Sequence, residues 1–229
     1  MSGHHFLFVP GPSNVPAAVQ QAIHCPMEDH RNPTIPDLIQ PITQDLKKIL
    51  RTEKGKVVFF PSSGTGCWEA ALQSTLNIGD KVLGASFGQF SMLWLDMCKR
   101  LQFEPITMEE EWGTGANPES YHKHLSEDKN HEIKCVLVCQ NETATGVRSD
   151  VQAIRKVMDD LNHPALLFVD GVSSVASYEF EMDKWGVDAI VSGSQKGFML
   201  PAGLGILGMS EKAIDAMKQS NYPTCYFDV

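Results

Sequence analysis

Several features of large protein classes are missing from this 229-residue sequence. No uninterrupted apolar run approaches the roughly 20 residues of a membrane-spanning helix. The 19 Lys and Arg residues form no block and are outnumbered by 28 Asp and Glu residues, which disfavours nucleic acid or an anionic membrane as a partner. The N-terminus lacks the basic start and apolar stretch of a signal peptide. The six cysteines include no Cys-x-x-Cys motif, which favours a reducing, intracellular environment.

Two common nucleotide-binding motifs are also absent. Gly64 and Gly66 begin a Gly-x-Gly pattern, but Glu69 stands where a dinucleotide-binding fingerprint requires a third glycine. No Gly-Lys-Ser/Thr follows these glycines, as a P-loop would require. A nicotinamide-dependent dehydrogenase is therefore disfavoured.

The sequence divides into two compositionally different parts. Residues 1–55 are rich in proline, and we predict an extended arm with short helices at 17–23 and 42–50. From residue 56, strand patterns alternate with helical ones. We predict strands at 57–61, 81–85, 103–108, 133–139, 165–169, 187–191 and 204–209, and helices at 68–76, 90–101, 118–125, 150–161 and 210–218.

This alternation predicts an α/β domain over residues 56–220, with a mostly parallel central sheet and helices on both faces. The strands at 187–191 and 204–209 are expected to form a hairpin. In parallel sheets, ligands bind at loops beyond the carboxyl ends of the strands. Three such loops contain chemically interesting residues.

The first loop, Ser62-Ser63-Gly64-Thr65-Gly66, lies between a strand and a helix. Its glycines allow close backbone approach, and the N–H groups at a helix N-terminus bind phosphate. The alternative is a tight turn with an N-cap.

The second loop begins at Asp170, directly after the apolar run Ala-Leu-Leu-Phe-Val. A carboxylate at the end of a buried strand is costly unless it meets a partner or a ligand, such as a protonated ring nitrogen. A helix cap or turn former is the alternative.

The third loop, Ser192-Gly193-Ser194-Gln195-Lys196-Gly197, places a lysine beyond a buried strand among small residues. An amine that burial partly neutralises forms an imine with an aldehyde, although most lysines are solvated and inert. A phosphate site, an acid for a ring nitrogen and an imine-forming lysine together match the requirements of pyridoxal 5′-phosphate (PLP).

Six stretches strengthen this hypothesis by a family resemblance: residues 7–12 (LFVPGP), 63–66 (SGTG), 141–147 (NETATGV), 169–174 (VDGVSS), 185–188 (WGVD) and 192–196 (SGSQK). With them the sequence resembles the class V aminotransferases of PLP-transferase fold type I. Within the family it is most similar to the serine–glyoxylate and alanine–glyoxylate group, in particular its plant-type peroxisomal members.

The resemblance implies roles for individual residues. Lys196 would form the Schiff base with PLP and move the proton during catalysis, and Asp170 would hold the pyridine nitrogen. Thr143 would bind the phenolic oxygen. Phe87 would stack on the ring, unless it is a core residue. The phosphate would be held by Ser63, Gly64, Thr65 and Gln195; Val172 would also line the cofactor site, and Pro12 and Ser13 the substrate pocket.

The resemblance also implies the reaction and the partners. An amino donor, serine or alanine, would give its nitrogen to glyoxylate, yielding hydroxypyruvate or pyruvate and glycine. A homodimer is expected, with the proline-rich arm as a subunit-wrapping element. The family location is the peroxisome, with the cytoplasm as the alternative.

Family members are longer, so we expect residues 221–229 to begin a connection to a small domain that this sequence lacks. That domain carries the arginine that binds the substrate carboxylate, and none of the arginines here matches it: Arg31, Arg51, Arg100, Arg148 and Arg155. Because such charge-assisted pairs contribute strongly to binding, we predict PLP binding with weak substrate turnover. A non-catalytic PLP-binding or dimerising fragment is the alternative. A cysteine desulfurase is less favoured, since Gln195 and Phe87 replace its two histidines.

Overall fold

The computed structural model describes residues 6–229, and its centre is a seven-stranded sheet in the order β1-β9-β8-β7-β4-β2-β3. The five adjacent strands β8, β7, β4, β2 and β3 are parallel to one another. Strand β9 is antiparallel to its two neighbours, β1 and β8. The strands are β1 (Lys56–Pro61), β2 (Lys81–Ser86), β3 (Glu104–Glu109), β4 (Ile133–Cys139), β7 (Leu166–Asp170), β8 (Ala189–Gly193) and β9 (Leu204–Met209). The predicted fold class is therefore confirmed, including the β8–β9 hairpin.

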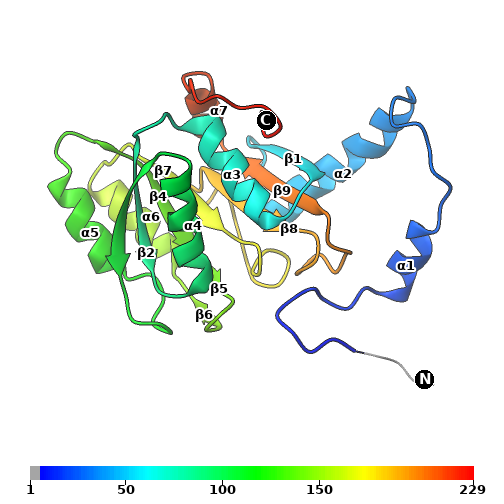
Figure 1. Cartoon of the computed structure of the whole chain (residues 1–229), viewed down its shortest axis with the longest axis horizontal. Coiled ribbons are helices and arrows are strands. Elements are labelled where there is room, and N and C mark those ends of the chain that lie inside the picture. Colours follow the sequence, from blue (N-terminus) through cyan, green and yellow to red (C-terminus); the bar gives the residue numbers. More distant parts are fainter. Residues whose placement is uncertain (1–5) are drawn as a thin grey trace.

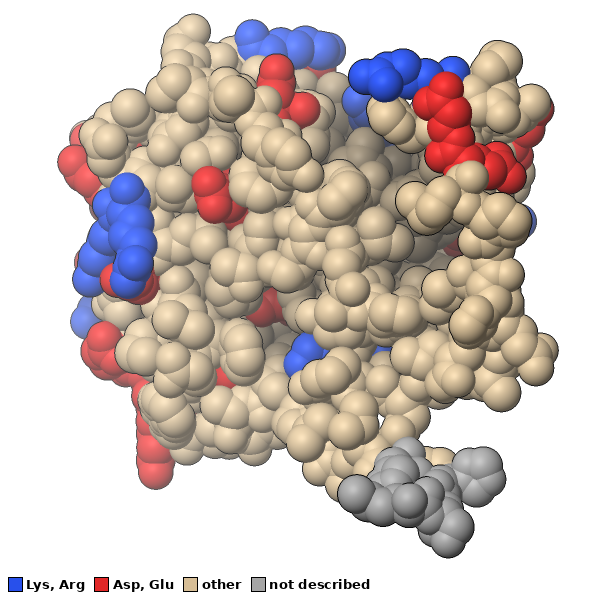
Figure 2. Space-filling model, turned by 45° about the vertical axis from the view of Figure 1, so that its right-hand side comes forward, with Lys and Arg blue, Asp and Glu red and all other residues tan. Residues whose placement is uncertain are grey.

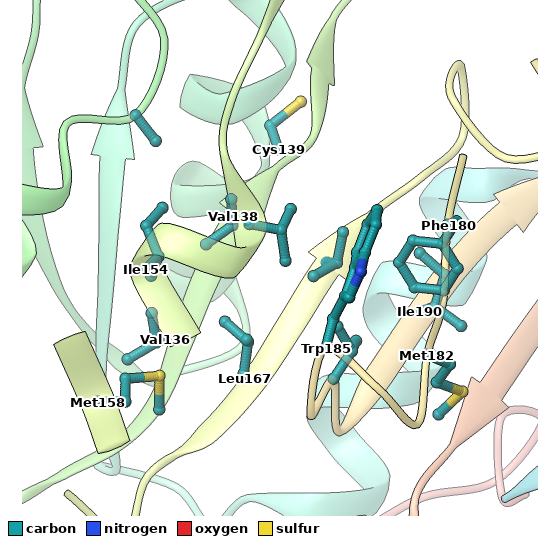
Figure 3. Close-up of a cluster of buried hydrophobic side chains, with 14 of the residues drawn as sticks. Val136, Val138, Cys139, Ile154, Met158, Leu167, Phe180, Met182, Trp185 and Ile190 are labelled. Atoms are coloured by element: carbon teal, nitrogen blue, oxygen red, sulfur yellow. The ribbon is translucent and has the colours of Figure 1, made fainter. Parts of the chain in front are cut away.

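Helices cover both faces of this sheet (Figure 1). One face packs against α3 (Gly64–Thr75), α4 (Gln89–Arg100) and α7 (Glu211–Met217); the other packs against α2 (Ile35–Leu50), α5 (Pro118–Glu127) and α6 (Val151–Asp160). Figure 3 shows the hydrophobic core on the face covered by α2, α5 and α6, where Ile154 and Met158 of α6 lie over Val136 and Leu167 of the sheet. This two-sided burial explains why the strands lack polar alternation.

Helix α2 begins at Ile35, seven residues before the predicted start. Pro36 lies in its first turn, where a proline is tolerated because the N–H group there has no intrahelical partner. Pro41 lies inside the helix. Only Leu46 and Leu50 of α2 are buried, so its N-terminal half stands away from the core. Helix α1 (Ala17–Ile23) has the predicted bounds and buries no residue.

Helix α3 begins at Gly64, so the glycine-containing loop forms its first turn. The prediction placed the start at residue 68, because glycine has a low intrinsic helix propensity. A small hairpin was not predicted; it pairs β5 (Asn141–Glu142) with β6 (Val147–Arg148). None of the helices within residues 6–229 is long and apolar enough to cross a membrane.

Candidate active site at the carboxyl ends of the strands

The three predicted loops meet at one edge of the sheet, because β1, β7 and β8 all end there. A Cβ atom on Gly64 would lie 2.3 Å from Val172 Cγ2, so the 62–66 turn touches the loop after β7. A Cβ atom on Gly193 would lie 3.5 Å from the backbone nitrogen of Gly64. The loop after β8 therefore lies against the first turn of α3.

Lys196 lies within this group of loops and is only partly exposed. Its pKa is lowered because burial disfavours the ammonium form, while the negative charge of Asp170 acts in the opposite direction. A lowered pKa increases the fraction of free amine, the form that attacks an aldehyde. The direction of this shift favours imine formation by Lys196.

The N-terminal arm returns to this lysine from far away in the sequence. Lys196 Nζ donates to the carbonyl oxygen of Pro10 at 3.3 Å. Ser13 Oγ donates to the carbonyl oxygen of Lys196 at 2.9 Å, and Ser13 N donates to that of Gln195. Gly11 has φ +151°, and a Cβ there would lie 2.7 Å from Lys196 Nζ, so glycine is required for this approach. Pro12 and Ser13 thus lie at the lysine, and their substrate role stays a prediction.

Asp170 is buried at the end of β7, with 5% of its surface exposed. Its Oδ1 accepts from Val172 N at 2.8 Å, and the thiol of Cys139 lies 3.7 Å from Oδ2. Burial raises the pKa of Asp170 to about 7, and the charge of Glu142 acts in the same direction. Within the described chain no cation forms an ion pair with it, although the charge of Lys196 acts to lower its pKa. A protonated ring nitrogen would supply the missing positive charge.

The first turn of α3 has the groups needed to bind a phosphate. Ser63 is the N-cap residue, but its side chain makes no capping hydrogen bond, so the first N–H groups of the helix remain available. Gly64 is buried, while Ser63 and Thr65 are exposed. The side-chain amide of Gln195 has a buried oxygen without a partner in the described chain. Because the amide orientation is an assignment, Gln195 can present its N–H₂ group instead.

Thr143 lies in the turn between β5 and β6, beyond the end of β4. This hairpin is fixed to the loop after β7, since Asn141 Nδ2 donates to Ser173 Oγ at 2.8 Å and Ser173 Oγ donates to the Asn141 carbonyl oxygen. Ser174 Oγ also donates to Gln140 Oε1. The hairpin therefore keeps Thr143 at the same edge as Asp170.

A family model decides between the remaining possibilities: the model for class V aminotransferases matches residues 5–228. The chain belongs to this family. It is 56% identical over 223 residues to a serine–glyoxylate aminotransferase of Hyphomicrobium methylovorum, covering 96% of this chain and 55% of the relative. It is 48% identical over 229 residues to an L-aspartate–glyoxylate aminotransferase of Paracoccus denitrificans, covering 100% of this chain and 58% of the relative.

A solved structure supports the same assignment. The crystal structure of an alanine–glyoxylate aminotransferase from Nostoc sp. superposes with a TM-score of 0.90 at 27% identity, covering 100% of this chain and 60% of that chain. The chain spans a little over half the length of the curated relatives it matches. Among residues 6–229, no group of three or more His, Cys, Asp and Glu side chains is arranged to hold a metal ion.

Phe87, the predicted ring-stacking aromatic, lies just beyond the end of β2. Only 1% of its surface is exposed, and it packs in the core cluster with Leu83, Ala85 and Tyr121. Its stacking role therefore stays a prediction, with a core phenylalanine at a strand end as the alternative. Phe90, three residues later, is only partly buried and lies in the first turn of α4 beside the hairpin. It is the aromatic residue of this loop that keeps an accessible surface.

The sequence analysis missed Glu142, the residue before Thr143. Its side chain is fully buried, and its Oε2 accepts from the backbone nitrogens of Phe90 and Ser91 at 3.0 and 2.9 Å. Its Oε1 accepts from Ala144 N at 3.1 Å. A carboxylate at a helix N-terminus is stabilised by the helix dipole. Glu142 therefore joins the start of α4 to the Thr143 turn; a lone acid in the otherwise uncharged stretch 135–147 was the available signal.

Proposed function

We propose that this chain is the cofactor-binding part of a PLP-dependent glyoxylate aminotransferase, with Lys196 as the residue that reacts with the cofactor. One observation carries the proposal: the partly buried amine of Lys196 lies among a buried acid, an uncapped helix N-terminus and the N-terminal arm. The amine, the acid and the helix N-terminus match three parts of PLP, namely the aldehyde, the ring nitrogen and the phosphate.

When bound, PLP would supply an aldehyde and a protonated ring that withdraws electrons from the substrate α-carbon. Asp170 would hold the positive charge at the ring nitrogen. The N–H groups of Gly64 and Thr65, with Ser63 and Gln195, would bind the phosphate. Thr143 would donate to the phenolic oxygen. Lys196 Nζ would move the proton at the substrate Cα, a task for which its lowered pKa suits it.

Phe90 is our candidate for the aromatic residue that packs on the cofactor ring, in place of Phe87. Its backbone nitrogen is held by Glu142, and the same carboxylate holds the turn that carries Thr143. One buried side chain would thus hold both candidate cofactor-binding residues in place relative to each other. Val172, which lies against Gly64, is a further candidate for lining the cofactor site.

For the amino donor we propose serine, with glyoxylate as the acceptor, so that the products are hydroxypyruvate and glycine. The relative with 56% identity is named as a serine–glyoxylate enzyme, which supports this choice. Alanine is the second candidate, and the relative named for L-aspartate makes aspartate a third donor to test.

We also propose that the arm and α2 contact a second copy of the chain. Large apolar side chains are exposed there, including Phe8 at 95%, Met27 at 98% and Leu38 at 60%. Figure 2 shows a side of the molecule on which uncharged residues predominate and charged ones lie mainly along the top and left edges. An exposed apolar surface of this kind is typical of a protein–protein interface.

The test is to add PLP to the purified chain and record the visible absorption band of lysine-bound cofactor. We expect a band in the wild type, none in Lys196→Ala, and an unchanged band in Lys156→Ala, which removes an exposed lysine paired with Asp160. A band of equal intensity in Lys196→Ala would refute the proposal.

Serine and glyoxylate are then added, and glycine is measured. Glycine formation that requires Lys196 supports an aminotransferase. A stable band without glycine formation supports the second candidate, a PLP-binding chain without aminotransferase activity. The chain spans 55% of the length of the relative named serine–glyoxylate aminotransferase, so the assay tests whether this part alone has the activity of that relative.

A further inference from the structure

The C-terminal segment, residues 220–229, lies along one side of α3. At the C-terminal end of the helix, Ser220 Oγ donates to the Leu76 carbonyl oxygen at 2.9 Å and Asn221 N donates to Asn77 Oδ1 at 2.7 Å. Farther along, Ser74 Oγ donates to the Phe227 carbonyl oxygen at 3.2 Å. Figure 1 shows the end of the chain returning to the region of α3 and β1. The segment is therefore packed on the helix that begins at the 62–66 turn.

Two aromatic residues of this segment contact both ends of the 62–66 turn. The hydroxyl of Tyr226 donates to the carbonyl oxygen of Pro61, directly before the turn, at 3.2 Å. The ring of Phe227 lies against Gly66, where a Cβ atom would be only 3.1 Å from the ring. The same ring packs on Phe60 with 5.8 Å between centroids. The segment thus bridges the end of β1 and the first turn of α3.

This bridge has consequences for phosphate binding, because the first N–H groups of α3 bind a ligand only if their directions are fixed in advance. No side chain caps the helix, so the turn depends on contacts from outside it. Of the three atoms nearest to a Gly66 Cβ, one is Ser62 Oγ, within the turn itself, and two belong to the Phe227 ring. Phe227 is therefore an external support of the turn.

We propose that Phe227, assisted by Tyr226, is a positioning residue for recognition of the cofactor phosphate. It acts by holding the 62–66 turn in the conformation that directs its N–H groups outward, and it contacts no part of the cofactor itself. This inference rests on the proposed function, since it concerns the phosphate of PLP. Residues 226 and 227 would thus contribute to phosphate recognition.

The experiment compares the binding of PLP with that of pyridoxal, which lacks the phosphate, using the visible band of the Lys196-bound form. In Phe227→Ala we expect the PLP affinity to fall about tenfold, the size expected for loss of an aromatic contact with its buried area, and the pyridoxal affinity to change less than about twofold. Phe227→Tyr keeps the ring and is expected to restore PLP affinity. Tyr226→Phe removes only the bond to Pro61, so a loss of about threefold is expected.

Tyr222→Ala is the matched control, because Tyr222 belongs to the same segment but packs on Phe103, with 5.4 Å between ring centroids. It is expected to leave the ratio of PLP to pyridoxal affinity unchanged. The inference is overturned if Phe227→Ala leaves this ratio unchanged, or if Tyr222→Ala lowers it equally. If Phe227→Ala does not fold, Tyr226→Phe decides by the same ratio. A wild-type chain that binds neither compound at Lys196 refutes the proposed function instead.

Discussion

Replacement of Asp170 by asparagine is expected to make the cofactor-free chain more stable while it weakens PLP binding. Burial raises the pKa of this carboxyl from 3.8 to about 7, so the folded chain keeps a proton that the unfolded chain has lost. The unfolding free energy contributed by Asp170 therefore falls as the pH rises from about 4 to about 7, and stays low above that range. At about 1.4 kcal/mol per pH unit, the full cost is roughly 4 kcal/mol.

The amide of the Asp170→Asn variant would carry no charge at any of these pH values and would still accept from Val172 N. We therefore expect Asp170→Asn to raise the unfolding free energy by up to about 4 kcal/mol near pH 8, with little change near pH 4. The measurement is urea-induced unfolding of the cofactor-free chain at both pH values, with the slope m as a check that the same surface is exposed. Asp215→Asn is the control, because Asp215 is an exposed carboxylate paired with Lys218.

The effect on the cofactor has the opposite sign. A neutral amide cannot balance a protonated ring nitrogen, so Asp170→Asn is expected to weaken PLP binding about 10- to 100-fold, the range for loss of a charge-assisted hydrogen bond. Our reasoning about Asp170 is refuted if wild type and variant lose the same stability between pH 4 and pH 8, or if PLP affinity is unchanged. In the wild type, the buried carboxyl of Asp170 is therefore expected to lower the stability of the cofactor-free chain and to strengthen PLP binding.

Three further predictions concern the surrounding residues. Gly11→Ala would place a Cβ atom 2.7 Å from Lys196 Nζ, so we expect loss of the visible PLP band with a stability loss of only about 1–3 kcal/mol in urea unfolding; a full band would contradict the observed approach of the arm. Glu142→Gln removes a buried charge that accepts three N–H groups, and we expect about 2–4 kcal/mol lower stability together with weaker PLP binding; an effect on stability alone would argue against its link to the site. Phe87→Ala should cost roughly 3–5 kcal/mol of stability, whereas Phe90→Ala should lower PLP affinity roughly fivefold; the reverse pattern in unfolding and titration would restore Phe87 as the stacking residue.

The fold class and three of the site loops followed from the sequence for a simple physical reason. Apolar runs without alternation require a sheet that is covered on both faces, and such a sheet is mostly parallel. Parallel strands end at one edge, so residues that follow β1, β7 and β8 must lie near each other. The proximity of Gly64, Asp170 and Lys196 could therefore be predicted from short stretches of sequence.

Other parts of the site depend on contacts between residues far apart in the chain, which no local pattern specifies. The sequence did not show that Phe87 is more deeply buried than Phe90, or that the first turn of α3 packs against Val172. Glu142 accepts hydrogen bonds from the start of α4 only because that helix begins beside the β5–β6 hairpin.

The sequence by itself therefore determined the kind of sheet, the family resemblance and the amine, acid and glycine turn that belong together, because each is written in a continuous stretch of residues. Only the tertiary structure decided that the arm returns to Lys196 through Pro10 and Ser13, and that Phe227 supports the turn at Gly66. Such contacts arise from packing of whole elements, whose free energy is shared over many residues rather than encoded in any one motif.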